Sequence, residues 1–368
     1  MSMNAANGRR IVFADIDGRS AVGSADPSPI IHTMGGLSPL THTMLDPVFG
    51  TQPAPPTTPQ PDTGSGPSAI EIDGDYFDDQ WHFDFLGDIE KIWEEYSGVG
   101  VHVGVYDDGL QYSHPDLGDN YDASRQVTVG GELLDPDYYA SLGFAHGTSV
   151  AGLIGAERNE FGTTGVAWGA SLTGVPIFYG PADINNNYVG FLEAVDQTEN
   201  FDIVNHSWGK LPFFWQHPQV WDQDPALIAE WMEAVENGRD GLGTVIVKAA
   251  GNDNRNANGD LGATSRASIV VGAYDDDGDA SYYSSFGSNL LVSAPSNGGF
   301  SFLAPPSDWV SPNQGIVTTD LLGLFNGYDI VDPNLGYLEG DYTNAFGGTS
   351  AATPVVSGVI ALNARGQS

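Results

Sequence analysis

The chain has 368 residues, 40% of them hydrophobic, which suffices for one large domain or two smaller domains with a substantial core. Aspartate and glutamate outnumber lysine and arginine 48 to 12, so the formal net charge is −36, which argues against nucleic-acid partners because the phosphate backbone would be repelled. No cysteine is present, which excludes disulfides, thiolate metal sites and cysteine nucleophiles.

The first seventy residues do not have the composition of a packed domain. The segment "PAPPTTPQPDTGSGPS" is rich in proline, threonine, serine and glycine, and we expect residues 1–70 to form a disordered extension. The N-terminal arginines are not followed by the apolar stretch of an ordinary secretory signal. No window is apolar enough to cross a bilayer, which predicts no membrane partner.

A globular pattern begins near residue 71. Ile89, Ile92, Trp93 and Tyr96 fall at helical spacing, and Gly98 is a suitable helix stop. Beyond it, short apolar strands alternate with helical stretches. Strands are expected at residues 101–106, 171–178, 201–208, 243–250 and 268–274, and helices at residues 146–157, 187–199 and 225–238. This alternation predicts an α/β fold with a mainly parallel sheet covered by helices on both faces, in which ligands bind beyond the carboxyl ends of the strands.

Three motifs along this pattern carry the residues of nucleophilic catalysis. "VGVYDDGLQYSHPDL" places Asp107 and Asp108 directly after a strand, "FAHGTSVAGLIGA" places His146 at the start of a buried helix, and "FGGTSAATPVVSGVIAL" places Ser350 at the start of another. Acyl transfer at a serine needs a base for the hydroxyl proton and a carboxylate that orients this base. A fourth motif, "VIVKAAGNDN", leaves Asn252 just past a strand, where its amide and the backbone N–H of Ser350 could both donate to an oxyanion.

The order of aspartate, histidine and serine in these motifs resembles that of the subtilisin-like serine peptidases (peptidase family S8), over about residues 75 to 365. Several phrases, "FDDQWHF", "DDGL", "HSWG", "GLGTVIVKAAGN" and "GIVTTDL", resemble the kexin and proprotein-convertase branch. The resemblance implies a subtilisin-like three-layer α/β/α fold and serine endopeptidase activity on polypeptide substrates. It makes Asp107 the triad carboxylate.

The same resemblance suggests which residues contact a substrate. Asp108 would lie beside the pocket for the residue before the scissile one, and Ser207, Trp208 and Gly209 would pair with an extended peptide. Asp260 matches a pocket acid, so a preference for basic residues before the scissile bond is one hypothesis. The residues after Gly209, "KLPFFWQ", lack the acidic run usual in that branch, and Phe213, Phe214 and Trp215 would instead form an apolar wall.

The resemblance also implies a structural calcium ion. The segment "AERNEFGTT" matches, without gaps, a calcium-binding loop of subtilisins. It assigns side-chain ligands to Asp116 and Asn159 and carbonyl ligands to Glu157, Phe161 and Thr163, with Asp73 or Asp75 completing the shell. Calcium prefers such an oxygen-only set, although an ordinary acidic loop remains the alternative.

Two expectations concern the whole protein. Residues 71–368 are expected to form the peptidase domain, which ends sooner after "GVIAL" than members of the family generally do. This shortness leaves open a catalytically silent, subtilisin-shaped binding or structural module. Peptidases of this kind usually act outside the cytoplasm, so a secreted location is expected. The oligomeric state and natural substrate cannot be inferred.

Overall fold

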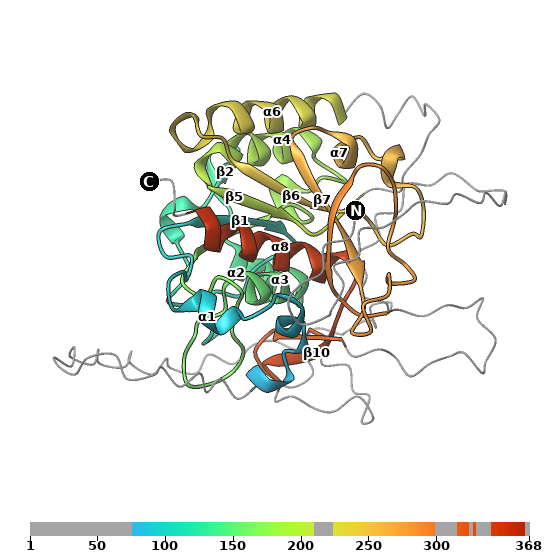
Figure 1. Cartoon of the computed structure of the whole chain (residues 1–368). Coiled ribbons are helices and arrows are strands. Elements are labelled where there is room, and N and C mark those ends of the chain that lie inside the picture. The colour runs from blue at the N-terminus through green and yellow to red at the C-terminus, as the bar shows by residue number, and fades with distance from the viewer. Residues whose placement is uncertain (1–75, 210–223, 299–314, 324–326, 329–339, 365–368) are drawn as a thin grey trace, which may run out of the picture.

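The structure is a computed structural model, which describes residues 76–209, 224–298, 315–323, 327–328 and 340–364. Its centre is a six-stranded sheet in the order β4-β1-β5-β6-β7-β8, and every neighbouring pair of strands is parallel. The strands are β1 (His102–Asp107), β4 (Ser171–Pro176), β5 (Ile203–His206), β6 (Val245–Ala249), β7 (Ser268–Tyr274) and β8 (Leu290–Pro295). Figure 1 shows this sheet between two helical layers.

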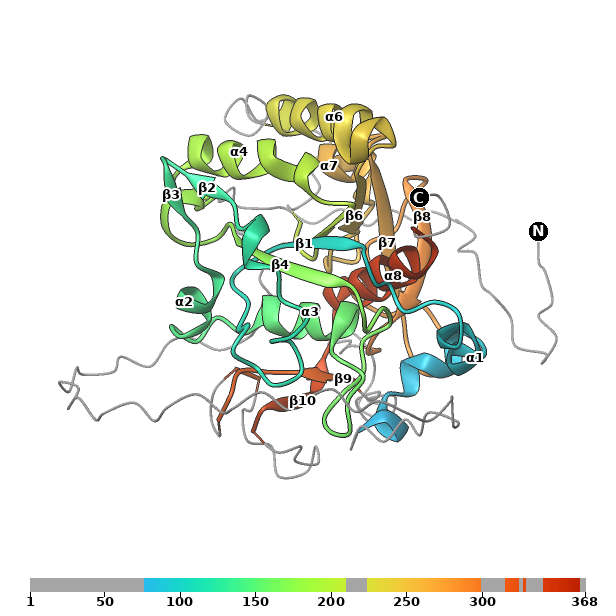
Figure 2. The same ribbon diagram turned by 90° about the vertical axis from the view of Figure 1, so that its left-hand side faces the viewer.

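Helices cover both faces of the sheet. α3 (His146–Gly155) and α8 (Thr349–Ala364) lie on one face, and α4 (Tyr188–Asp196) and α6 (Asp224–Gly241) lie on the other (Figures 1 and 2). Every residue of α3 is buried, as its apolar sequence predicts. The three-layer α/β/α architecture with a mainly parallel sheet is therefore confirmed.

The strands β1, β4, β5 and β6 are buried on both sides because each contributes to two cores. Val103 and Val105 of β1 pack into the core beneath α3 and α8, whereas Tyr106 packs into the core beneath α4 and α6. Trp231 of α6 is fully buried in that second core. Such burial explains why the strands read as nearly continuous apolar runs.

Smaller elements surround the sheet. They are α1 (Ile89–Trp93), α2 (Pro136–Ala140), α7 (Leu261–Thr264), the pairs β2 (Thr128–Val129) with β3 (Glu132–Leu133) and β9 (Ile316–Thr319) with β10 (Tyr342–Phe346), and 3-10 helices at Phe77–Asp79, Trp81–Phe85, Ala123–Arg125, Gly180–Ala182, Gln197–Asn200 and Ala257–Gly259. β9 is fixed to α3 by the hydroxyls of Thr318 and Thr319, which donate to the carbonyls of Ser149 and Thr148 at 2.8 Å each.

The expected helix around residue 92 is shorter than the spacing suggests. α1 ends at Trp93, and Tyr96 lies beyond it with 44% of its surface exposed. Ile92 is also 38% exposed, so the apolar stripe narrows to Ile89 and Trp93. A helix of five residues obtains its stability from packing rather than from propensity, and only those two side chains reach the core.

Several expectations fall outside the described residues: the extension at residues 1–70, Asp73 and Asp75, and the aromatic residues 213–215. No described helix has the length and apolar character needed to cross a membrane.

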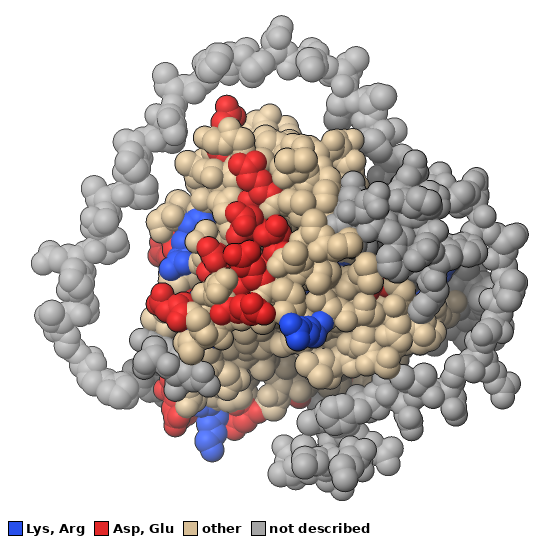
Figure 3. Space-filling model, turned by 90° about the horizontal axis from the view of Figure 1, so that it is seen from above, with Lys and Arg blue, Asp and Glu red and all other residues tan. Residues whose placement is uncertain are grey.

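The acidic excess is visible on the outer surface. Seen from the side that α4 and α6 cover, aspartate and glutamate side chains form a broad band with few lysines or arginines (Figure 3). Glu233 and Glu236 of α6 are among the exposed acids. Such a band is expected where a helix exposes one polar face to solvent. It lies on the opposite side of the sheet from α3 and α8.

The order of the strands fixes where a site can form. The chain adds β4 on one side of β1 and then β5 on the other side. Ligands in open parallel sheets bind where the direction of strand addition reverses, beyond the carboxyl ends of the two strands. β1 ends at Asp107 and β5 ends at His206, so Asp107 and Ser207 meet at this reversal point.

Candidate active site

A buried carboxylate–imidazole pair lies at the end of β1. The Oδ1 atom of Asp107 is 2.7 Å from Nδ1 of His146, the first residue of α3. The same Oδ1 accepts the backbone N–H of Asp108 at 2.8 Å. Asp107 is 1% exposed and His146 is 7% exposed. A carboxylate at Nδ1 fixes the tautomer and the ring orientation, which leaves Nε2 available as a base.

Ser350 lies in the first turn of α8 and exchanges two hydrogen bonds with Ser207. Its hydroxyl donates to the Ser207 carbonyl at 2.9 Å, and the Ser207 hydroxyl donates to the Ser350 carbonyl at 2.9 Å. The second bond is needed because Pro354, four residues on, has no N–H for that carbonyl. Leaving such a buried carbonyl unpaired would cost about 1–3 kcal/mol.

The pair with Ser207 belongs to a buried polar chain. The Asn205 side chain donates to the Ser207 hydroxyl at 2.9 Å, and the Ser357 hydroxyl donates to Asn205 Oδ1 at 2.8 Å. These side chains join β5 to two turns of α8. This role of Ser207 was not predicted from the sequence. Pro354 at the fourth position after Ser350 was the signal that an outside donor is required.

The imidazole and the hydroxyl come from neighbouring segments. The His146 ring packs edge-on against Phe346, four residues before Ser350, with ring centroids 5.3 Å apart. Within the part of the chain that the structure describes, no hydrogen bond joins His146 to the Ser350 hydroxyl, which is held by Ser207 instead. In active sites without substrate, such hydrogen bonds are often long or poorly aligned.

Asn252 is oriented by the residue before Ser350. Its Oδ1 accepts from the backbone N–H of Thr349 at 2.7 Å and from the Thr349 hydroxyl at 2.9 Å. With the oxygen fixed in this way, Nδ2 is left as a donor beside Gly348, where an added Cβ would lie 3.0 Å away. Gly348 has a φ of +78°, so this close turn requires glycine. This amide and the backbone N–H groups of the first turn of α8 therefore provide hydrogen-bond donors on the same side of the site.

Two carboxylates and one imidazole share this buried space, and each affects the others. Burial and the charge of Asp107 raise the pKa of Asp108 to about 7. Burial lowers the pKa of His146, but the charge and hydrogen bond of Asp107 and the charge of Asp108 outweigh it, so that this pKa lies above its ordinary value. The imidazole is thus biased toward holding a proton.

The two acids predicted to contact substrate are both engaged within the protein. Asp108 is 6% exposed and accepts the N–H groups of His146 and Gly147 at 3.2 and 2.8 Å, so it caps α3 from a neighbouring loop. Asp260 caps α7 and pairs with Lys248. Trp208 is 6% exposed, and Gly209 follows it on the segment that leaves β5. Of these three residues, Ser207 contacts Ser350 directly.

The predicted calcium loop encloses Asp116. This carboxylate is buried and accepts Thr163 N–H at 2.8 Å and the Asn159 amide at 3.3 Å. No group of three or more histidine, cysteine, aspartate or glutamate side chains that could hold a metal occurs among the described residues. Backbone carbonyls would therefore have to supply most of a calcium shell.

The carbonyls of this loop fit that requirement. Within the described ranges, the carbonyls of Glu157, Phe161 and Thr163 accept no hydrogen bond, whereas those of Gly162 and Thr164 accept from Tyr76 and Gln80 at 3.0 Å each. The three carbonyls assigned to calcium are thus free to bind an ion, and those of Phe161 and Thr163 alternate with the two bonded ones. The donor set of oxygen atoms suits calcium.

Comparison with known proteins identifies the family. The family model described as "Subtilase family" matches residues 98–366. The chain belongs to the subtilase family. This subtilase is 30% identical over 319 residues to a calcium-dependent protease of Trichormus variabilis, covering 78% of this chain and 43% of that protein. It is 32% identical over 309 residues to an extracellular serine protease of Aeromonas sobria, covering 75% of this chain and 47% of that protein.

A convertase and a solved protease structure are also similar to this chain. Neuroendocrine convertase 2 of Bos taurus is 28% identical over 310 residues, covering 80% of this chain and 44% of the convertase. The crystal structure of the Aeromonas sobria serine protease matches with a TM-score of 0.67 and 28% identity, over 83% of this chain and 56% of that one. This subtilase thus spans less than half the length of these curated relatives.

The electrostatic link between Asp108 and His146 can be tested by NMR. In Asp108→Asn, a negative charge that favours the protonated imidazole is removed, so the pKa of His146 should fall. The measurement is the pH titration of the His146 ring resonances, assigned with His146→Gln. Glu233→Gln, which neutralises an exposed acid of α6, is the control and should leave the midpoint unchanged. An equal midpoint in Asp108→Asn and in the unaltered protein would contradict the assignment.

Proposed function

We propose that this subtilase is a serine endopeptidase that hydrolyses peptide bonds through Asp107, His146 and Ser350. The observation that carries the proposal is the buried 2.7 Å contact between Asp107 and His146 at the sheet edge where α8 begins with Ser350. Serine proteases among the relatives support the same reaction class. Residues 71–368 would make up the peptidase domain.

The mechanism follows from these groups. The Ser350 hydroxyl leaves the Ser207 carbonyl, gives its proton to Nε2 of His146 and attacks the carbonyl carbon of the scissile peptide bond. Asp107 stabilises the imidazolium that forms. The negative oxygen of the tetrahedral intermediate accepts from Asn252 Nδ2 and from the Ser350 N–H. The imidazolium then protonates the leaving amine, and a water molecule, deprotonated by His146, hydrolyses the acyl-enzyme at Ser350.

The substrate would bind as an extended strand along Ser207, Trp208 and Gly209, with main-chain hydrogen bonds supplying affinity. A preference for basic residues before the scissile bond is the finer hypothesis. The convertase relatives and Asp108 close to His146 favour it, whereas the pairing of Asp260 with Lys248 opposes it for the residue immediately before that bond. The hydrogen bonds that Asp108 makes to α3 limit the charge it can offer to a substrate. Polypeptides are the proposed partners, and export is proposed because a relative is named an extracellular protease.

One observation favours the alternative of a catalytically silent, subtilisin-shaped module. The Ser350 hydroxyl donates to Ser207 rather than to His146. If that bond were permanent, the hydroxyl would have no base. The labelling experiment below separates the two functions.

We further propose that calcium stabilises the loop around Asp116, as the name of the Trichormus relative suggests. Asp116 and Asn159 side chains and the free carbonyls of Glu157, Phe161 and Thr163 would hold the ion. The ion would supply charge compensation for a buried carboxylate and no step of the reaction.

Activity is tested with a fluorophosphonate, which reacts only with an activated serine. We expect the unaltered protein to be labelled, and Ser350→Ala and His146→Ala not to be labelled. Asn252→Ala should bind peptide but turn over about 10²–10³-fold more slowly, which is the size of this effect in subtilisin. Equal labelling of the unaltered protein and of Ser350→Ala, or no labelling of either, would favour the silent module.

The calcium proposal is tested by thermal unfolding. Added calcium should raise the melting temperature of the unaltered protein, and a chelator should lower it, because an ion that binds only the folded state stabilises it. Asp116→Asn should abolish most of this response, whereas Asp119→Asn, an exposed neighbour, should retain it. A melting temperature that does not respond to calcium or chelator would refute the site.

A further inference from the structure

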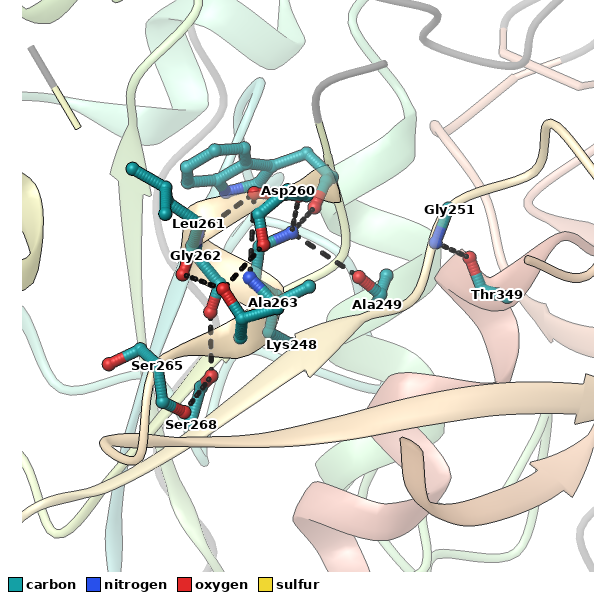
Figure 4. A network of polar contacts seen from close by, with 12 residues as sticks. Lys248, Ala249, Gly251, Asp260, Leu261, Gly262, Ala263, Ser265, Ser268 and Thr349 are labelled. Carbon is teal, nitrogen blue, oxygen red and sulfur yellow. Dashed lines mark hydrogen bonds and ion pairs between the residues drawn. The ribbon is translucent and has the colours of Figure 1, made fainter. Parts of the chain in front are cut away.

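A buried ion pair lies behind the segment that borders Ser350. The ammonium of Lys248, in β6, is 3.1 Å from Oδ2 of Asp260, and the two side chains are only 2% and 7% exposed. Nζ also donates to the carbonyls of Trp208 at 3.2 Å and Ala249 at 3.3 Å. Figure 4 shows Lys248 and Asp260 pointing toward each other at the centre of this network.

Both oxygens of Asp260 are occupied. Oδ1 accepts the N–H groups of Gly262 and Ala263 at 2.9 and 3.4 Å, and Oδ2 is held by Lys248. Lys248 is likewise enclosed, with the Trp208 ring 5.6 Å from its ammonium. The Asp260 carboxylate thus accepts from three donors, and Lys248 already balances its charge.

The Lys248–Asp260 pair lies close to Gly209, in the segment that follows Ser207. A Cβ at Gly209 would be 3.5 Å from Lys248 Nζ and 4.0 Å from Asp260 Oδ2. Gly209 and Trp208 continue from Ser207, whose carbonyl accepts the Ser350 hydroxyl. The residue whose carbonyl Ser350 attacks must lie beside this segment, so a charge behind it would be felt by that residue's side chain.

We propose that Lys248 is a specificity-determining residue. Its ammonium binds Asp260 in the way that a basic side chain of a substrate otherwise would, so the enzyme does not select arginine or lysine immediately before the scissile bond. The proposal rests on the endopeptidase function proposed above and names its substrate class.

The physical reason is that a basic substrate would have to displace Lys248. The Lys248 side chain is 2% exposed, and its displacement would break its charge–charge contact and its two carbonyl bonds. A substrate cation would therefore meet a pair whose two charges already cancel, and it would gain no partner there. Basic and neutral side chains of the substrate are then bound about equally well.

The competing explanation is that the pair only joins β6 to α7. That role would change stability, or the rate with all substrates equally. The charge preference at one substrate position distinguishes the two roles, because only the proposed role makes it follow the net charge of the pair.

The first arm uses the unaltered protein and peptides that differ only in the residue before the cleaved bond: arginine, methionine or glutamate. We expect kcat/KM for arginine and methionine to agree within about threefold. An arginine preference of about tenfold or more would overturn the proposal. This arm needs no variant and therefore does not depend on the folding of one.

The second arm is a charge cycle. Lys248→Met leaves Asp260 uncompensated and should raise the arginine-to-methionine ratio about tenfold or more, whereas Asp260→Asn leaves the ammonium and should raise the glutamate-to-arginine ratio. The double variant, neutral at both positions, and Lys248→Arg should keep the ratios of the unaltered protein. Ratios that stay constant in every folded variant would overturn the proposal.

Fluorophosphonate labelling of each protein distinguishes a failure of the Lys248 proposal from a failure of the proposed endopeptidase function. Labelled proteins whose ratios do not follow the pair's charge refute the role of Lys248 alone. An unaltered protein that is folded but neither labelled nor active refutes the endopeptidase function itself.

Discussion

The reversal of strand addition at β1 brings the site together, and the rest of the structure depends on it. Because β4 and β5 flank β1, the carboxyl ends of β1 and β5 deliver Asp107 and Ser207 to one edge of the sheet. α3 and α8 pack side by side on one face, and their first turns bring His146 and Ser350 to the same edge. The rings of His146 and Phe346, two hundred positions apart in the chain, are thereby brought into contact.

Burial gives this edge its chemistry, and each buried charge has an identifiable partner. Asp107 is held by His146, Asp108 by the N–H groups of α3, and Asp260 by Lys248. In a protein of net charge −36, the buried carboxylates at this edge are thus compensated locally, and the excess acid lies on solvated surfaces such as the band over α6. Removing one partner of such a pair leaves an uncompensated charge, which typically costs about 3–5 kcal/mol.

The sequence predicted the layers, the parallel sheet and the motif positions, because strand burial and helix starts leave local patterns. It predicted less of what depends on contacts between distant segments. The bond from Ser207 to the Ser350 carbonyl could have been inferred from Pro354, but the identity of the donor required the fold. A buried partner for Lys248 could have been inferred from its place in an apolar strand, but only the structure shows that Asp260 is that partner. The helix predicted around residue 92 was too long, because spacing alone does not reveal that Tyr96 is exposed rather than packed in the core.

The convergence of Asp107, His146, Asn252 and Ser350 is the central claim, and a crystal structure with a peptide boronic acid tests it most directly. The account predicts boron bonded to Ser350 Oγ, one boron oxygen within hydrogen-bonding distance of Asn252 Nδ2, and Nε2 of His146 within hydrogen-bonding distance of Ser350 Oγ or of the second boron oxygen. Boron bound elsewhere, or an imidazole that remains out of reach of both atoms, would contradict the account.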